Sequence, residues 1–198
     1  MRFARLIVLA ALSAAPVLVV APRDAGASVA ITQTLKDLVD RSESVVVGIP
    51  KSRTSRWENG RIVTYTTVAV DQAVAGVAKA GETITVRTLG GTVDDIGQVV
   101  HGEAVLKTGA PQLLFLYALP ASPTLLPSAR AVTAMAQGVM PVVVGTDKIA
   151  RIGTSAGGVA LVPHPDPKAV SAGVATHGRT LAEVATDVRT LWAARAKK

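Results

Sequence analysis

A serine with glycine neighbours, and the acidic and imidazole side chains after it, form the first set of residues that could carry chemistry. The segment 153–157 reads Gly-Thr-Ser-Ala-Gly, which has the Gly-x-Ser-x-Gly spacing of a nucleophile elbow. The possible catalytic partners downstream are His164, Asp166, His177 and Asp187. An elbow needs a strand before the serine and a helix after it, whereas the apolar run at 159–162 favours a strand there. We therefore expect a glycine-rich hairpin turn and keep hydrolysis through Ser155 as the weakest alternative.

The histidines and two adjacent aspartates are candidates for metal ligands. His101, His164 and His177 have neither helical nor clustered spacing, whereas zinc sites bring several ligands together. The segment Gly90–Asp95 resembles one unit of a calcium-binding glycine repeat, but it occurs once and that architecture needs stacked copies. We expect loop histidines, a solvated acidic loop and no metal site. The chain also has no phosphate-binding or dinucleotide-binding glycine motif, so we expect no cofactor.

The strongest candidate for a binding site is a basic hairpin that contains a tryptophan. Its residues are Lys51, Arg53, Arg56, Trp57 and Arg61, and Glu58 is the only acid among them. Guanidinium groups bind carboxylate, sulfate or phosphate through paired hydrogen bonds. The alternative is an ordinary solvated strand end, with Trp57 folded onto the domain as a plug.

The stretch from Arg56 to Leu89 must position this hairpin, and the rest of the chain is organised around it. Asn59-Gly60 is typical of a two-residue hairpin turn, because both residues tolerate the positive φ angles of a type I′ turn. The β-branched run from Arg61 to Val70 predicts a long strand. Alternation over 83–87 predicts a second strand with one buried face. Its residues that should point to water are Thr83, Thr85 and Arg87.

Further strands and a short helix should cover this hairpin. The segment Thr32–Asp40 predicts a helix capped by Thr32 or Thr34. Ser44–Ile49 predicts a buried strand that ends at Pro50, and the polar residues after it should form a connection. The other expected strands are 111–117, buried on both faces, 132–135, 139–144, and a second hairpin that pairs 148–152 with 159–162.

The chain should close with an amphipathic helix. Thr180 and Glu183 have the spacing of a capping box, and apolar residues recur at helical spacing from Leu181 to Trp192. Many short strands with a helix at each end predict a mainly β protein. We expect a small antiparallel barrel of OB type, or a sandwich, with a short amino-terminal helix and an amphipathic carboxyl-terminal helix.

Residues 1–27 have the pattern of a secretory signal peptide. A short basic start precedes an apolar run from Leu6 to Ala21, and Ala25-Gly26-Ala27 offers small residues to a signal peptidase. We expect cleavage after Ala27, with Ala30 as the second choice. The alternative is an uncleaved anchor, which would be short because a span needs ~20 apolar residues. We therefore expect an exported protein, periplasmic or extracellular, in which residues 28–198 form one domain without a transmembrane span.

Composition restricts the stabilising forces and the partners. The chain has no cysteine, so no disulfide stabilises it, and roughly 170 residues are enough to bury about 70% of the unfolded surface. The first 27 residues carry three arginines and one aspartate, so five of the seven net positive charges belong to residues 28–198. This modest excess favours anionic partners and gives no specific signal for nucleic acid.

Five short motifs in the mature chain carry a family resemblance. They are Ser42–Gly48, Trp57–Thr64, Gly90-Gly91, Leu114-Phe115-Leu116 and Gln137-Gly138. With these motifs the chain resembles a group of exported, largely uncharacterised bacterial β-barrel proteins. More distantly, the order of elements is similar to the OB-type barrel of netrin-like domains and tissue inhibitors of metalloproteases. Those inhibitors use an amino-terminal cysteine against the protease zinc, and this chain has no cysteine.

These observations together predict a non-enzymatic module that binds another macromolecule, either a protein or an anionic surface polymer. The basic hairpin is the expected binding site. The first alternative, an inhibitor of a secreted protease, is implied by the distant resemblance alone. The second is the serine hydrolase acting through Ser155.

Overall fold

Strands dominate the structure. The computed structural model describes residues 29–154, 160–165 and 176–195, of which 45% lie in strands and 17% in helices, so the expected mainly β class is confirmed. The elements in chain order are β1 (Val29–Ile31), α1 (Leu35–Asp40), β2 (Ser44–Glu58), β3 (Arg61–Gly76), β4 (Thr83–Leu89), β5 (Gly91–Val93), β6 (Ile96–Gln98), β7 (Gln112–Ala118), β8 (Arg130–Val132), the 3-10 helix η1 (Met135–Gly138), β9 (Val139–Val144), β10 (Ala150–Ile152), β11 (Ala160–Val162) and α3 (Leu181–Arg195).

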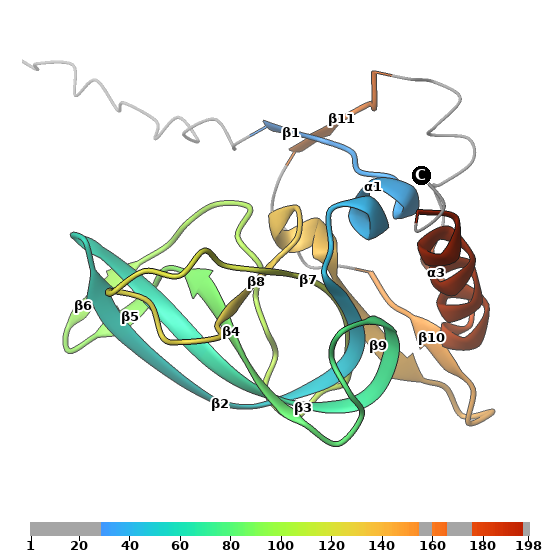
Figure 1. Cartoon of the computed structure of the whole chain (residues 1–198), viewed down its shortest axis with the longest axis horizontal. Helices are drawn as coiled ribbons and strands as arrows, with labels where there is room; N and C mark the ends of the chain where they lie inside the picture. The colour runs from blue at the N-terminus through green and yellow to red at the C-terminus, as the bar shows by residue number, and fades with distance from the viewer. Residues whose placement is uncertain (1–28, 155–159, 166–175, 196–198) are drawn as a thin grey trace, which may run out of the picture.

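Five strands close a barrel. β2, β3 and β4 form an antiparallel meander, and β7 pairs with the first part of β2. β8 pairs with both β4 and β7 and thereby closes the ring. β9 pairs with β7 and continues into β10, so that a second hairpin leaves the barrel on one side (Figure 1). The structure therefore has the barrel and not the sandwich, with one parallel pair, β4–β8, in its wall.

Two apolar clusters lie on the two sides of the barrel wall. Val68, Val86 and Leu114 belong to the cluster that fills the barrel. Phe115 belongs to a second cluster outside it, which the helices α1 and α3 cover. Figure 1 shows these helices together on one side of the barrel. Because successive residues of a strand point to opposite faces, β7 is buried on both, which explains its uninterrupted apolar run.

Local sequence signals fix the turn and both helix starts where expected. Asn59 and Gly60 have φ angles of 49° and 74°, as a type I′ turn requires. Thr34, not Thr32, caps α1, with its hydroxyl 3.1 Å from the amide of Asp37. The hydroxyl of Thr180 accepts a hydrogen bond from the Glu183 amide at 3.2 Å, at the start of α3.

The expectation that a strand ends at Pro50 is wrong, because β2 continues to Glu58. Pro50 pairs with Val68 of β3, and its carbonyl points to the other edge of β2, where it accepts the amide of Gly109 at 2.8 Å. The nitrogen of Pro50 faces that same edge, so its missing N–H removes no bond to β3. A bulge at Lys51 then resets the register, and the polar segment after it is strand rather than connection.

Two further expectations about strands are also wrong. The segment 148–152 does not pair with 159–162: β10 pairs with β9, whereas β11 pairs in parallel with β1 from the other end of the described chain. The strand expected at 132–135 ends at Val132, because Ala134 and Met135 have positive φ angles of 55° and 57° and lead into η1. In both cases the deciding partner or backbone angle is not encoded in the local pattern.

Candidate functional site

The residues of the predicted basic hairpin lie on the outer half of β2 and the start of β3. The β2–β7 pairing stops at Gly48, so this half of β2 pairs only with β3. Four of the five predicted side chains are exposed there: Lys51, Arg53, Trp57 and Arg61. Trp57 is 49% exposed, so it does not act as a plug on the barrel. The fifth residue, Arg56, is half-buried.

The strand register divides these residues between two faces. Arg53 lies opposite Thr66, and Arg56 lies opposite Val63. Directly opposed residues of an antiparallel pair share a face, and neighbouring residues along a strand do not. Arg53 and Trp57 therefore lie on the face that continues into the barrel interior, whereas Arg56 lies on the opposite face.

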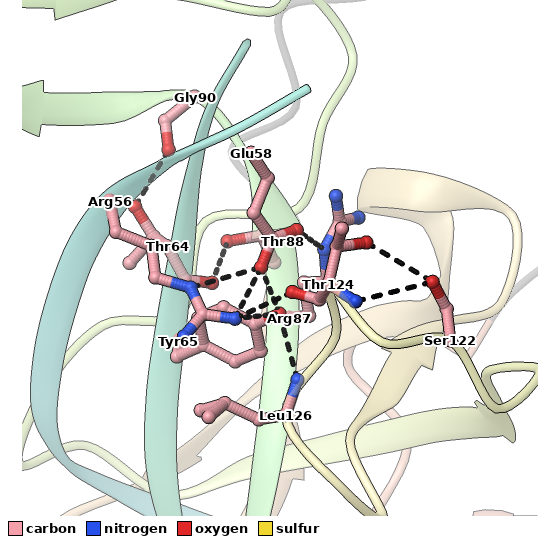
Figure 2. Close-up of polar contacts among 10 residues, drawn as sticks. All are labelled: Arg56, Glu58, Thr64, Tyr65, Arg87, Thr88, Gly90, Ser122, Thr124 and Leu126. Atoms are coloured by element: carbon pink, nitrogen blue, oxygen red, sulfur yellow. Dashed lines mark hydrogen bonds and ion pairs between the residues drawn. The ribbon is translucent and has the colours of Figure 1, made fainter. Parts of the chain in front are cut away.

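Arg56 belongs to a buried polar cluster around Glu58 (Figure 2). The Glu58 side chain is only 4% exposed. Its Oε1 accepts hydrogen bonds from Nη2 of Arg56 at 2.7 Å and from the hydroxyl of Tyr65, and its Oε2 accepts Nε of Arg87 at 2.9 Å. The Arg56 guanidinium also lies 4.6 Å from the centre of the Tyr65 ring. Arg87, expected to point to water, is instead held against this carboxylate.

This cluster holds the carboxylate ionised and attaches a loop to the hairpin. Burial would raise the pKa of Glu58, but hydrogen bonds from Tyr65, Arg56 and Arg87 outweigh burial and lower that pKa below its usual value. Arg56 Nη2 also donates to the carbonyl of Thr124 at 2.9 Å, and the Leu126 amide donates to the Tyr65 hydroxyl at 3.3 Å. A general acid or base needs a pKa near the working pH, so this cluster fits a structural role.

Hydroxyl groups line a hollow between the β2–β3–β4 meander and the segment that follows β4. It measures about 300 Å³, and its lining includes Arg53, Thr64, Thr66 and Thr88. The hydroxyl of Thr64 donates to the Gly90 carbonyl at 2.7 Å and lies 2.9 Å from that of Ser55. A side chain on Gly91 would meet both hydroxyls within 2.4 Å. The Gly-Gly segment is thus needed for β5 to cross the hairpin closely, and a calcium-repeat role does not explain it.

A larger pocket of about 550 Å³ adjoins this hollow. The two share the lining residues Arg53, Glu103, Val105 and Leu106. The pocket continues from there between the segment that precedes β7 and the strand β9, and Gln112 lines it.

The outer edge of β2 has no strand beside it among the described residues from Lys51 to Trp57. Residues that flank a two-residue turn exchange their backbone hydrogen bonds, and bonded and non-bonded pairs then alternate along the hairpin. Counting back from Glu58, the backbone N–H and C=O groups of Trp57, Ser55 and Arg53 point away from β3. This edge therefore offers free backbone donors and acceptors between exposed side chains.

The described residues add no support for the other candidate chemistry, which is metal binding by the histidines and hydrolysis through Ser155. His101 and His177 are exposed, and His164 lies 3.5 Å from a carboxylate oxygen of Asp37. No group of three potential metal ligands occurs in the described ranges. Ser155 and Asp166 lie outside those ranges, and Asp187 forms an ion pair with Arg179 at 2.8 Å. The hydrolase and protease-inhibitor alternatives stay predictions.

No family model matches the chain, and no curated protein matches it by sequence. Among the described residues, no helix is long and apolar enough to cross a membrane.

Sequence reasoning missed three residues of these sites. The sequence predicts strands at Tyr65 and Arg87 but no partner for either, because their contact with Glu58 depends on the register of three strands. Gln112 carried one detectable signal: it is the only polar residue between Pro111 and Phe115 in a strand predicted to be buried on both faces.

Proposed function

We propose that this chain is an exported, non-enzymatic binding module that holds an extended, acidic segment of a partner protein along the outer edge of β2. The free backbone edge from Lys51 to Trp57 is the observation that carries the proposal. Extended peptides bind such edges by adding a strand, with backbone hydrogen bonds for affinity and side chains for specificity.

Export rests on the pattern of residues 1–27. The mass of the chain recovered from host envelope or medium should show a start at Ser28.

The charge at this edge favours an acidic partner. Lys51, Arg53 and Arg61 are exposed, whereas the nearby Glu58 is buried and paired with Arg56 and Arg87. Lysine and arginine on a free edge also oppose pairing between two copies of the same strand. An acidic segment, in contrast, gains from these charges both in affinity and in association rate.

Trp57 supplies the aromatic contact that strand addition lacks by itself. Its side chain is exposed next to the turn, on the same face as Arg53. Buried aromatic rings and arginines dominate the binding energy of many protein interfaces. An apolar residue in the partner segment would cover this ring.

Fluorescence anisotropy with a labelled ten-residue peptide of alternating glutamate and valine tests the proposal. We expect it to bind, and the matching lysine–valine peptide to bind much more weakly. The acidic peptide N-methylated on the residues that would face β2 should lose binding, because it can no longer donate to the edge. Equal binding of the methylated and unmethylated peptides, or no binding of the acidic peptide, would contradict strand addition.

A matched pair of variants at Ser55 tests the same edge from the protein side. Ser55→Pro removes an outward N–H, whereas Ser55→Ala keeps it, and both lose the hydroxyl contact with Thr64. We expect Ser55→Pro to weaken peptide binding about tenfold more than Ser55→Ala does. Thermal melts of both variants control for folding, and the methylated peptide decides the question if Ser55→Pro does not fold.

A further inference from the structure

The 550 Å³ pocket has the size and lining of a small-molecule site. Pockets that hold small molecules measure roughly 300–1,000 Å³ and are mainly apolar with a few polar groups. The apolar residues that line this pocket include Leu106, Ala110, Pro111, Val139, Pro141 and Val142. They come from the segment before β7 and from β9.

One buried polar group in this lining has no partner. Gln112, at the start of β7, is 3% exposed, and its Oε1 has no hydrogen-bond partner among the described residues. Buried polar groups nearly always have a partner, because an unpaired one loses its hydration without compensation. A ligand that donates a hydrogen bond here would supply that partner.

The charged residues of the pocket favour an anionic ligand. Arg53 and Lys107 are exposed and form no ion pair with other described residues. The carboxylate of Glu103 already accepts the amide of Ala104 at 2.9 Å. Two unpaired cations outnumber one carboxylate that already accepts a hydrogen bond. They attract a negative group to the part of the pocket that Arg53 and Lys107 line.

Two exposed valines extend the apolar lining to the surface. Val105 and Val143 are 69% and 56% exposed, and both line the pocket. Single exposed valines are common on proteins. Two that flank one apolar pocket provide a surface that the apolar body of a ligand would cover.

We propose that this pocket binds a small amphipathic acid. Its apolar chain lies against Leu106 and Val139, its anionic group faces Arg53 and Lys107, and its far end donates a hydrogen bond to Gln112. A hydroxylated fatty acid released from lipid and a free hydroxy acid share this chemistry. The site is independent of the β2 edge except for Arg53.

Isothermal titration calorimetry with ω-hydroxydecanoate, decanoate and decane diol tests each part of this chemistry. We expect ω-hydroxydecanoate to bind about tenfold more tightly than decanoate, because only the hydroxy acid satisfies Gln112. The diol should bind more weakly than the hydroxy acid, because it lacks the anionic group. The same titration with the shorter ω-hydroxyhexanoate distinguishes the two possible origins of the ligand. A higher affinity for the longer acid indicates a lipid-derived acid, and equal affinity indicates a small free acid.

Variants assign these differences to individual residues. Gln112→Leu should reduce the affinity for ω-hydroxydecanoate to that for decanoate and leave decanoate binding unchanged. Lys107→Glu, at the surface, should weaken both acids and spare the diol. Thermal melts control for folding, and Lys107→Glu keeps the test decisive if Gln112→Leu is unstable.

The peptide and the acid distinguish the two proposed sites. Gln112→Leu should leave binding of the glutamate–valine peptide unchanged, and Ser55→Pro should leave acid binding unchanged. The pocket proposal is overturned if neither ω-hydroxydecanoate nor decanoate binds. It is also overturned if Gln112→Leu weakens the binding of both acids equally. Either result leaves the β2 edge proposal standing.

Discussion

At the scale of single residues, the carboxylate of Glu58 shows how burial changes what a charge can do. In the sequence it is the one acid among basic residues, and it could have weakened the positive surface of the hairpin. In the structure it is withdrawn from that surface and engages Arg56 and Arg87 on the opposite face from Arg53. The outer edge of β2 therefore stays positive although an acid is adjacent in the sequence.

Glu58→Gln should lower the free energy of unfolding at neutral pH by about 2 kcal/mol. Glutamine keeps the shape but loses the charge that Arg56 and Arg87 share, and both arginines retain some access to water. The pKa of Glu58 is lower in the folded chain than its ordinary 4.5. Its stabilisation is therefore complete above 4.5 and is lost as the pH falls through the lower folded value.

Urea unfolding measures this effect at neutral pH, above the ordinary pKa of 4.5, and at about pH 3, below it, where the carboxylate begins to take up a proton. The difference between the native chain and Glu58→Gln should shrink at the lower pH. Asp95→Asn, at an exposed position in the turn between β5 and β6, serves as a control and should change stability by less than about 0.5 kcal/mol. A pH-independent difference would show that Glu58 stabilises the fold by packing and not by its charge.

Residue types predicted some side-chain environments and not others. The exposure of Trp57 and Arg53 agrees with the sequence-based binding surface. The contact between Glu58 and Arg87 does not follow from sequence, because the two are brought together only by the pairing of β3 with β2 and β4. Long-range register of this kind has no signature in the composition of either strand.

At the scale of elements, the sequence predicted best where a single local interaction decides. The Asn59-Gly60 turn and the Thr34 and Thr180 caps depend on residues within a few positions of each other. β11 could not be placed, because its partner β1 lies far away in the chain and pairs in parallel. Pro50 misled the prediction because a proline ends a strand only where its missing N–H would face a neighbour.

The tight connection between β8 and β9 depends on Gly138, the last residue of η1. A Cβ atom at this position would lie 2.0 Å from the Thr133 carbonyl oxygen and 2.9 Å from a methyl group of Val132. The backbone oxygen cannot move away without disturbing β8, which closes the barrel. Gly138→Ala should therefore lower the free energy of unfolding by at least about 2 kcal/mol.

Thermal or urea unfolding measures this loss, with Gly97→Ala as the matched control. The closest atom to a Cβ on Gly97 is the Thr92 hydroxyl at 3.8 Å, so the control should change stability by less than about 0.5 kcal/mol. Equal effects of the two substitutions would show that the connection can relax, and that barrel closure does not depend on this glycine.

At the scale of the whole molecule, the barrel wall couples two apolar clusters. Val45 and Val47 of β2 belong to the outer cluster under the helices, and Val46 between them belongs to the barrel interior. The same alternation occurs along β7. Because the clusters share their strands, loss of packing on one side should weaken the pairing on which the other side depends.

This coupling predicts that the described barrel and α3 unfold as one unit. Val184 of α3 and Val68 of β3 are both completely buried, in the outer and the inner cluster respectively. Val184→Ala and Val68→Ala should each lower the free energy of unfolding by about 2 kcal/mol, through lost burial and the cavity left behind. Each should shift the urea midpoint without changing the slope of the transition.

Val77→Ala, at a position 58% exposed, should leave the midpoint almost unchanged. Far-ultraviolet dichroism and Trp192 fluorescence, both measured in a Trp57→Phe background so that Trp192 is the only tryptophan, should follow the same curve, since a two-state transition gives coincident probes. If Val184→Ala instead produced an early fluorescence transition with the strand signal intact, α3 would be a separate layer, and the shared wall would not couple the two clusters.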